Sequence, residues 1–373
     1  MINLPLLHQL ADRLRLNRKR PVFIVGRFRS GTTALWNILR RSDEAFALYE
    51  PLHDSLNTHL EHPAAPDATH RGVTDYFHEY RAHREEILPL YRMEFGATRL
   101  ALSAKDSYPE LKTYLAALID LAGEKVPVLK CVRLDYRLAW LRRHFPQALI
   151  IYLVRNPREQ WISMAAKDNA DLKVPRWMSV YQSSAFAANL MFVLPEIMGG
   201  EDQHAYERAY YLWRISQVVG QKYADLYVDF DREFLAADPA LFARLASQTG
   251  VPIPPQVIEE CLHRDIPRRS SREDINIPFA KIEQRCEAVL ERRGLLKAIQ
   301  AGILNSHWPL ASDLTPAQIT EAVNSLSLAS SREQQHTLEV DAALAQTRLT
   351  LQQAQTHVTT MQAELDHLRT IKP

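Results

Sequence analysis

Uninterrupted apolar runs constrain the fold of this chain most strongly. The clearest are VFIV at 22–25, VPVLKCV at 126–132 and ALIIYLV at 148–154, and stretches with helical periodicity separate them. Short runs that are apolar on nearly every residue are typical of strands buried on both faces, which occur in parallel sheets. We therefore predict an α/β fold in which helices cover both faces of a parallel sheet.

Weaker patterns complete the predicted element order. AFALY contains a further strand at 46–49, and LYVDF at 226–230 predicts another. The stretch from 50 to 72, which is rich in Pro, His and Asp, has no periodicity, so we expect a loop or lid there. Helical periodicity covers 31–41, 73–88, 109–122, 136–144, 157–166 and 205–224.

Both ends of the chain differ from the middle, so we expect an N-terminal helix at 1–20, a main domain at 21–312 and a helical tail at 313–373. The first segment is amphipathic with a basic end. It either packs on the domain or attaches weakly to an anionic membrane surface. In the tail, apolar residues recur every seven positions, as in a coiled coil. Residues 337–371 form a homo-oligomer, bind a partner, or pack on the domain as one helix.

Composition excludes several classes of protein. The 45 basic and 44 acidic residues leave a net charge of +1, which argues against binding to long nucleic acids. No run approaches the ~18 apolar residues of a transmembrane helix. The three cysteines are odd in number and far apart, which argues against a disulfide framework and favours a reducing, cytoplasmic compartment.

The sequence GRFRSGTT directly follows the first apolar run and has the spacing of a phosphate-binding loop. Its backbone N–H groups and the following helix N-terminus are expected to hold an anion. Thr32 stands where nucleoside triphosphatases have Lys, and Arg155 follows the strand 149–154 where a magnesium-binding Asp would be expected. We therefore expect a P-loop-type site that binds phosphate-like groups without a metal. The candidate binding residues are Arg27, Phe28, Arg29, Ser30, Gly31, Thr32 and Thr33.

These residues resemble a known family. VFIVGRFRSGTT resembles the 5′-phosphosulfate loop of the sulfotransferases, and LIIYLVRNPREQWISM resembles their second signature. In that family the Arg and Ser of the second signature, here Arg155 and Ser163, bind the 3′-phosphate of the donor. LKCVRLDYRLAWLRRHFPQALI and ALYEPLH resemble segments of bacterial and carbohydrate-type members. The two signatures occur in the order that the family has.

The resemblance implies the donor 3′-phosphoadenosine 5′-phosphosulfate and transfer of its sulfuryl group to a hydroxyl or amine of a small-molecule or glycan acceptor. Such a transfer needs a base. Glu50 is our first candidate, and His53 is the second because an ordinary histidine pKa near ~6.5 suits the task. Lys130 either stabilises charge on the transferring group or forms an ion pair. The alternatives are an atypical P-loop nucleotide kinase and a catalytically silent scaffold that acts through its tail.

Overall fold

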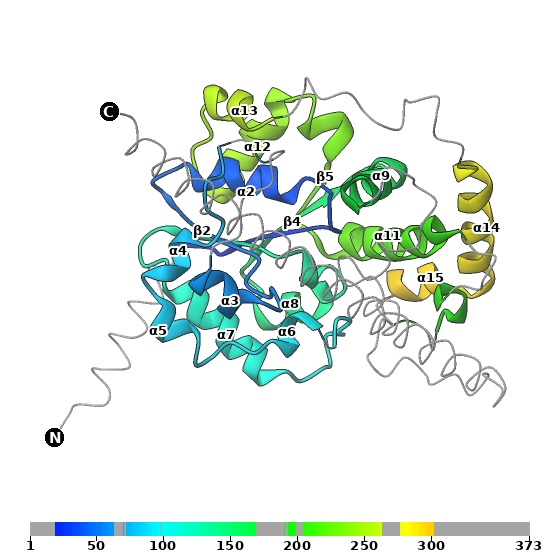
Figure 1. Ribbon diagram of the computed structural model, residues 1–373, viewed down its shortest axis with the longest axis horizontal. Helices are drawn as coiled ribbons and strands as arrows, with labels where there is room; N and C mark the ends of the chain where they lie inside the picture. Colours follow the sequence, from blue (N-terminus) through cyan, green and yellow to red (C-terminus); the bar gives the residue numbers. More distant parts are fainter. Residues whose placement is uncertain are drawn as a thin grey trace, which may run out of the picture. The chain divides into compact units, whose positions relative to one another are not determined.

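The computed structural model describes residues 19–62, 70, 72–97, 99–168, 190, 193–198, 204–262 and 277–301 (Figure 1). The chain divides into two compact units, Met1–Thr315 and Pro316–Pro373, and all described residues belong to the first. Most of the predicted N-terminal helix and the whole heptad tail lie outside the described residues. The membrane attachment, the self-association and the domain boundaries therefore stay predictions.

A five-stranded sheet with the order β2-β3-β1-β4-β5 forms the centre of the first unit. Every neighbouring pair of its strands is parallel, which confirms the predicted sheet. In the register, Ile24 of β1 lies opposite Lys130 of β3 and Ile151 of β4. The strands are β1 (Val22–Val25), β2 (Ala45–Tyr49), β3 (Val126–Lys130), β4 (Leu149–Val154) and β5 (Leu226–Asp229).

Helices cover both faces of this sheet because the chain reverses its direction of travel across it. The crossover from β1 to β2 runs one way, and those from β2 to β3, β3 to β4 and β4 to β5 run the other way. Right-handed crossovers then place α2 (Thr32–Arg40) opposite α7 (Pro109–Asp120), α8 (Leu138–His144) and α11 (Ala205–Tyr223). Figure 1 shows α2 and α7 on opposite sides of the strands. The predicted two-sided cover is confirmed.

The remaining helices pack around this layered centre. Helix α9 follows β4 and contacts α11, α13 contacts α2, and α14 and α15 contact α11. Their bounds are α3 (Leu56–Glu61), α4 (His78–Arg81), α5 (Arg84–Ile87), α6 (Glu94–Ala97), α9 (Pro157–Asp168), α12 (Pro239–Thr249), α13 (Pro255–Cys261), α14 (Phe279–Arg292) and α15 (Leu295–Gln300). Short 3₁₀ turns occupy Val132–Leu134 and Pro195–Met198, and a π-helical turn occupies Phe230–Phe234.

Three predicted segments differ from the structure. The loop expected at 50–72 contains α3, which buries Leu56 and Leu60 on one face. The helix expected at 73–88 is replaced by the two short helices α4 and α5. The side chain of Asp75 accepts a hydrogen bond from the Phe77 N–H at 3.0 Å, and such a local bond competes with helix formation. The strand expected at 226–230 ends at Asp229 for the same reason, because its carboxylate accepts the N–H groups that begin the π-helical turn.

The three cysteines are free and buried. Burial raises the pKa of the Cys131 thiol to about 12. A thiol with so high a pKa is protonated at neutral pH and is a poor nucleophile. The cysteines are therefore core residues in this structure.

Candidate active site

The loop between β1 and α2 adopts a tight conformation that depends on Gly31. The φ angle of Gly31 is 94°, and a Cβ added there would overlap the ring of Phe230. Arg29 also has a positive φ, 66°, which is uncommon for a residue with a side chain. Residues in such conformations persist only where their surroundings enforce them, and they cluster at functional sites.

The loop contains a buried hydroxyl without a partner in the described ranges and leads directly into the N-terminus of α2. The Ser30 hydroxyl is buried and has no hydrogen-bond partner among the residues that the structure describes. Thr32 and Thr33 are buried in the first turn of α2. Buried polar atoms are almost always hydrogen-bonded in folded proteins, and helix N-termini attract anions. The loop therefore fits an anionic ligand.

The loop touches the second predicted signature directly. The Arg29 Nε donates to the Ser163 Oγ of α9 at 3.1 Å. In return, the Arg155 Nη1 donates to the Arg29 carbonyl at 3.2 Å. Gln160 of α9, which the sequence did not single out, donates to the Phe28 carbonyl at 2.6 Å. The structure thus brings together the two segments that the sequence proposed as anion sites.

The side chain of Arg27 faces the protein interior. It is only 7% exposed, and its Nη1 donates to the Asp135 Oδ2 at 3.0 Å. Burial opposes the charge of Arg27, but the attraction of Asp135 outweighs it and raises the pKa of the guanidinium. Arg27 was predicted as a donor-binding residue of the loop. In the structure its side chain is engaged in a buried ion pair with Asp135.

Arg155 lies beside an aromatic ring that the sequence did not point to. Its guanidinium lies 5.3 Å from the centre of the Phe230 ring, and the same ring borders Gly31. The carboxylates of Glu159 and Asp231 lie 3.8 Å and 4.0 Å from the Arg155 guanidinium. Phe230 directly follows β5. Its position at the end of a strand is the one feature of the sequence that could have identified it as a site residue.

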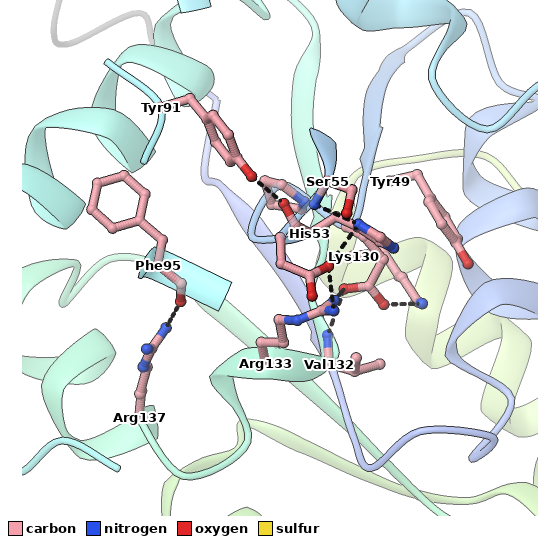
Figure 2. A network of polar contacts seen from close by, with 12 residues as sticks. Tyr49, His53, Ser55, Tyr91, Phe95, Lys130, Val132, Arg133 and Arg137 are labelled. Atoms are coloured by element: carbon pink, nitrogen blue, oxygen red, sulfur yellow. Dashed lines mark hydrogen bonds and ion pairs between the residues drawn. The ribbon is translucent and has the colours of Figure 1, made fainter. Parts of the chain in front are cut away.

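Glu50 and Lys130, from the ends of the neighbouring strands β2 and β3, form a buried ion pair. The Glu50 carboxylate bonds to the Lys130 Nζ, and its other oxygen accepts from the Val132 N–H at 3.3 Å and lies 3.8 Å from Arg133 Nη1 (Figure 2). Burial lowers the pKa of Lys130, but Glu50 outweighs this effect and the net shift is upward. Glu50 also has a positive φ of 41°.

His53 lies near this pair but is not part of it. Its Nδ1 accepts the Ser55 N–H at 3.1 Å (Figure 2). The Asp54 carboxylate lies 3.1 Å from the same Nδ1 and 3.3 Å from Arg133 Nη2. Arg133 therefore links the carboxylate of Glu50 to that of Asp54, and neither Arg133 nor Asp54 was singled out from the sequence.

Neither a metal site nor a membrane-spanning helix is found in the part of the chain that the structure describes. No group of three or more His, Cys, Asp or Glu side chains in the described ranges is arranged to hold a metal ion. No helix within those ranges is long and apolar enough to cross a bilayer.

The family follows from a comparison with protein-family models. Residues 21–191, which hold the loop, the Glu50–Lys130 pair and the Arg155 segment, match the model of the sulfotransferase family. This segment belongs to that family. A search of curated proteins finds no match.

Several solved sulfotransferase structures are similar to the chain. Sulfotransferase STF1 from Mycobacterium tuberculosis has 17% identity and a TM-score of 0.37, over 77% of this chain and 79% of that one. The sulfotransferase domain from the curacin biosynthetic pathway has 13% identity and a TM-score of 0.41, over 73% of this chain and 98% of that one. Sulfotransferase STF9 from Mycobacterium avium has 13% identity and a TM-score of 0.41, over 76% of this chain and 80% of that one.

Proposed function

We propose that this sulfotransferase-family chain moves a sulfuryl group from 3′-phosphoadenosine 5′-phosphosulfate to a hydroxyl or amine of an acceptor. The observation that carries the proposal is the direct contact between the loop and the Arg155 segment, through Arg29 and Ser163. The donor has two separate anionic groups, so it needs two adjacent anion sites at one end of a sheet. Ligands of open α/β sheets bind outside the carboxyl ends of the strands, where these residues lie.

In this proposal each anionic group has its own set of donors. The N–H groups of Phe28, Arg29, Gly31, Thr32 and Thr33, with the Ser30 hydroxyl, bind the 5′-phosphosulfate, while the Ser30 N–H donates to the Arg27 carbonyl. Arg155 and Ser163 bind the 3′-phosphate, and the forked donors of Arg155 suit a phosphate. Arg27 supports the loop from behind. No metal is required, because a sulfuryl group carries less charge than a terminal phosphate and Arg29 supplies a fixed positive charge.

The chemical step needs a base and a stabilising cation, and we assign Glu50 and Lys130 to these roles. The acceptor oxygen or nitrogen forms a bond to sulfur while the bond from sulfur to the donor phosphate breaks. Glu50 takes the proton of the acceptor, and adenosine 3′,5′-bisphosphate leaves. Negative charge develops on the leaving oxygen and attracts the Lys130 ammonium. Lys130 then gives up its ion pair with Glu50 and pairs with the leaving oxygen. The released Glu50 carboxylate can accept the proton. His53 is the second candidate for the base.

The acceptor class we propose is a carbohydrate or glycoconjugate, on the resemblance of ALYEPLH to carbohydrate-type members. We also propose a cytoplasmic location, which the free cysteines favour.

Calorimetry with adenosine 3′,5′-bisphosphate tests the donor assignment. We expect binding that survives a chelator, and an absence of binding at millimolar ligand would refute the proposal. Affinity that a chelator abolishes would favour a nucleotide kinase instead. Incubation with donor labelled in the sulfuryl group and a panel of glycans then tests the acceptor. Binding without any turnover on a broad panel would favour the scaffold.

A further inference from the structure

The carboxylate of Asp135 joins four separate elements behind the donor loop. It is 0% exposed, and its Oδ2 accepts from the Arg27 Nη1 at 3.0 Å and from the Ser216 Oγ at 2.9 Å. Ser216 of α11 in turn shares a 2.5 Å hydrogen bond with the Tyr152 hydroxyl of β4. The network thus connects the loop after β1, the turn after β3, strand β4 and helix α11.

We propose that Asp135 is a positioning residue for the donor loop, which it holds in its binding shape through Arg27. The Arg27 guanidinium contacts two rings, 5.5 Å from the centre of Phe28 and 5.4 Å from that of Tyr136. Because its Nη1 is also bonded to Asp135, the side chain has little freedom to move. The identity of the ligand rests on the proposed function, whereas the effect on loop shape does not.

The backbone of Arg27 carries this restraint into the anion-binding part of the loop. Its carbonyl accepts the Ser30 N–H at 3.1 Å, which closes the turn just before Gly31. Within that turn Arg29 holds its positive φ of 66°, a strained conformation that needs support from its surroundings. A displaced Arg27 would therefore move the Ser30 hydroxyl and the N–H groups that face the ligand.

The chemistry of the pair also favours a positioning role. Burial raises the pKa of the Asp135 carboxyl, and the hydrogen bonds and charge of Arg27 oppose that rise. A buried ion pair contributes little net stability compared with apolar residues of similar size, but it imposes a specific geometry. Here the ion pair with Asp135 fixes the position of Arg27, the first residue of the loop after Gly26.

The test compares Asp135→Asn with Glu207→Gln as a matched control. Glu207 of α11 is also a buried carboxylate, 2% exposed, and pairs with Arg285 of α14 at 2.6 Å and 2.9 Å. Each substitution removes one buried negative charge from an arginine pair, so both lower thermal stability. Two measurements follow in each variant: hydrogen exchange of peptides covering residues 26–33, and the affinity for adenosine 3′,5′-bisphosphate.

In Asp135→Asn we expect exchange in the loop and the dissociation constant of the bisphosphate to rise about tenfold, within the range for directly coupled residues. The donor KM should rise with them, while kcat changes less than about twofold because the groups assigned to the chemical step are untouched. Glu207→Gln should leave all these quantities near their wild-type values. Ser216→Ala, which removes only one bond to the same carboxylate, should give a smaller change in the same direction.

Three outcomes are distinguishable. Loop exchange in Asp135→Asn equal to that of the control overturns the positioning role. If the wild-type protein fails to bind the bisphosphate, the proposed donor is wrong, yet the exchange measurement still decides the role of Asp135. If Asp135→Asn does not fold, Ser216→Ala supplies the same comparison, and an unchanged loop in that variant counts against the proposal.

Discussion

Replacing Glu50 by Gln separates its proposed role as base from its role in a buried ion pair. The side chains of Glu50 and Lys130 are only 5% and 4% exposed, so solvent screens their interaction little. Glu50→Gln leaves the Lys130 ammonium buried without its carboxylate. Glu50→Gln combined with Lys130→Met removes both charges, so no buried charge of the pair remains.

The two roles predict different magnitudes for these variants. Breaking a buried ion pair by removing one partner costs about 3–5 kcal/mol of unfolding free energy, whereas removing both partners is often close to neutral. Loss of a general base lowers turnover by about 10²–10⁴-fold. We expect Glu50→Gln to lose both stability and turnover. The double variant should recover most of the stability but none of the turnover, with a remaining deficit because Arg133 also lies 3.8 Å from Glu50.

Denaturant unfolding and a labelled-donor turnover assay measure the two effects separately. Calorimetry with adenosine 3′,5′-bisphosphate serves as the control. The proposed donor site is built from other residues, so its affinity for the bisphosphate should change less than about twofold. The assay is run at saturating donor, below the unfolding midpoint of each variant. Any loss of turnover then reports on the chemical step and not on the fraction folded.

Two results would refute this reasoning. If Glu50→Gln keeps turnover within about threefold of wild type, Glu50 is not the base. His53→Ala should then show the large loss instead. If the double variant is no more stable than Glu50→Gln, the Lys130–Glu50 pair does not carry the energetic cost that its burial implies.

The remaining predictions concern the donor site, pH and the tail. Arg29→Ala and Arg155→Ala should each weaken bisphosphate binding by about 1.5–3 kcal/mol. Because the two residues touch, calorimetry of the double variant should show a loss smaller than the sum of the two single losses. Additive losses would contradict this coupling. His204 begins α11 by accepting the Tyr206 N–H at its Nδ1, and burial lowers its pKa below the ordinary value near ~6.5. Because the folded state then binds fewer protons than the unfolded state, His204 should reduce stability as pH falls below about 6.5. Denaturant unfolding of His204→Asn, which keeps a cap without titrating, should show a weaker decline between pH 6.5 and pH 5, and an identical profile would reject the assignment. Sedimentation of the full chain beside a version ending near Leu310 tests self-association through 337–371; we expect a larger species only for the full chain, and equal species would favour a tail packed as one helix.

Local patterns in the sequence determined the sheet and the loop between β1 and α2. The apolar runs 22–25 and 149–154 are buried strands, because a strand covered on both faces needs an apolar side chain at nearly every position. The spacing of Gly26 and Gly31 predicted the turn between β1 and α2. Parallel strands end at one edge of a sheet, so the residues after them, including Glu50, Lys130 and Arg155, were recognisable as candidates.

Only the tertiary structure decided which of these residues meet and which way their side chains turn. Arg27 and Asp135 are 108 residues apart and pair because the turn after β3 comes to lie behind the loop after β1. Phe230 borders Gly31 and Arg155 although it follows β5, and the ion pair of Lys130 with Glu50 depends on the register of β2 against β3. Sequence periodicity reports the burial of a residue, which is a local property. The partner of a polar group depends on strand order and register, which the whole sheet decides.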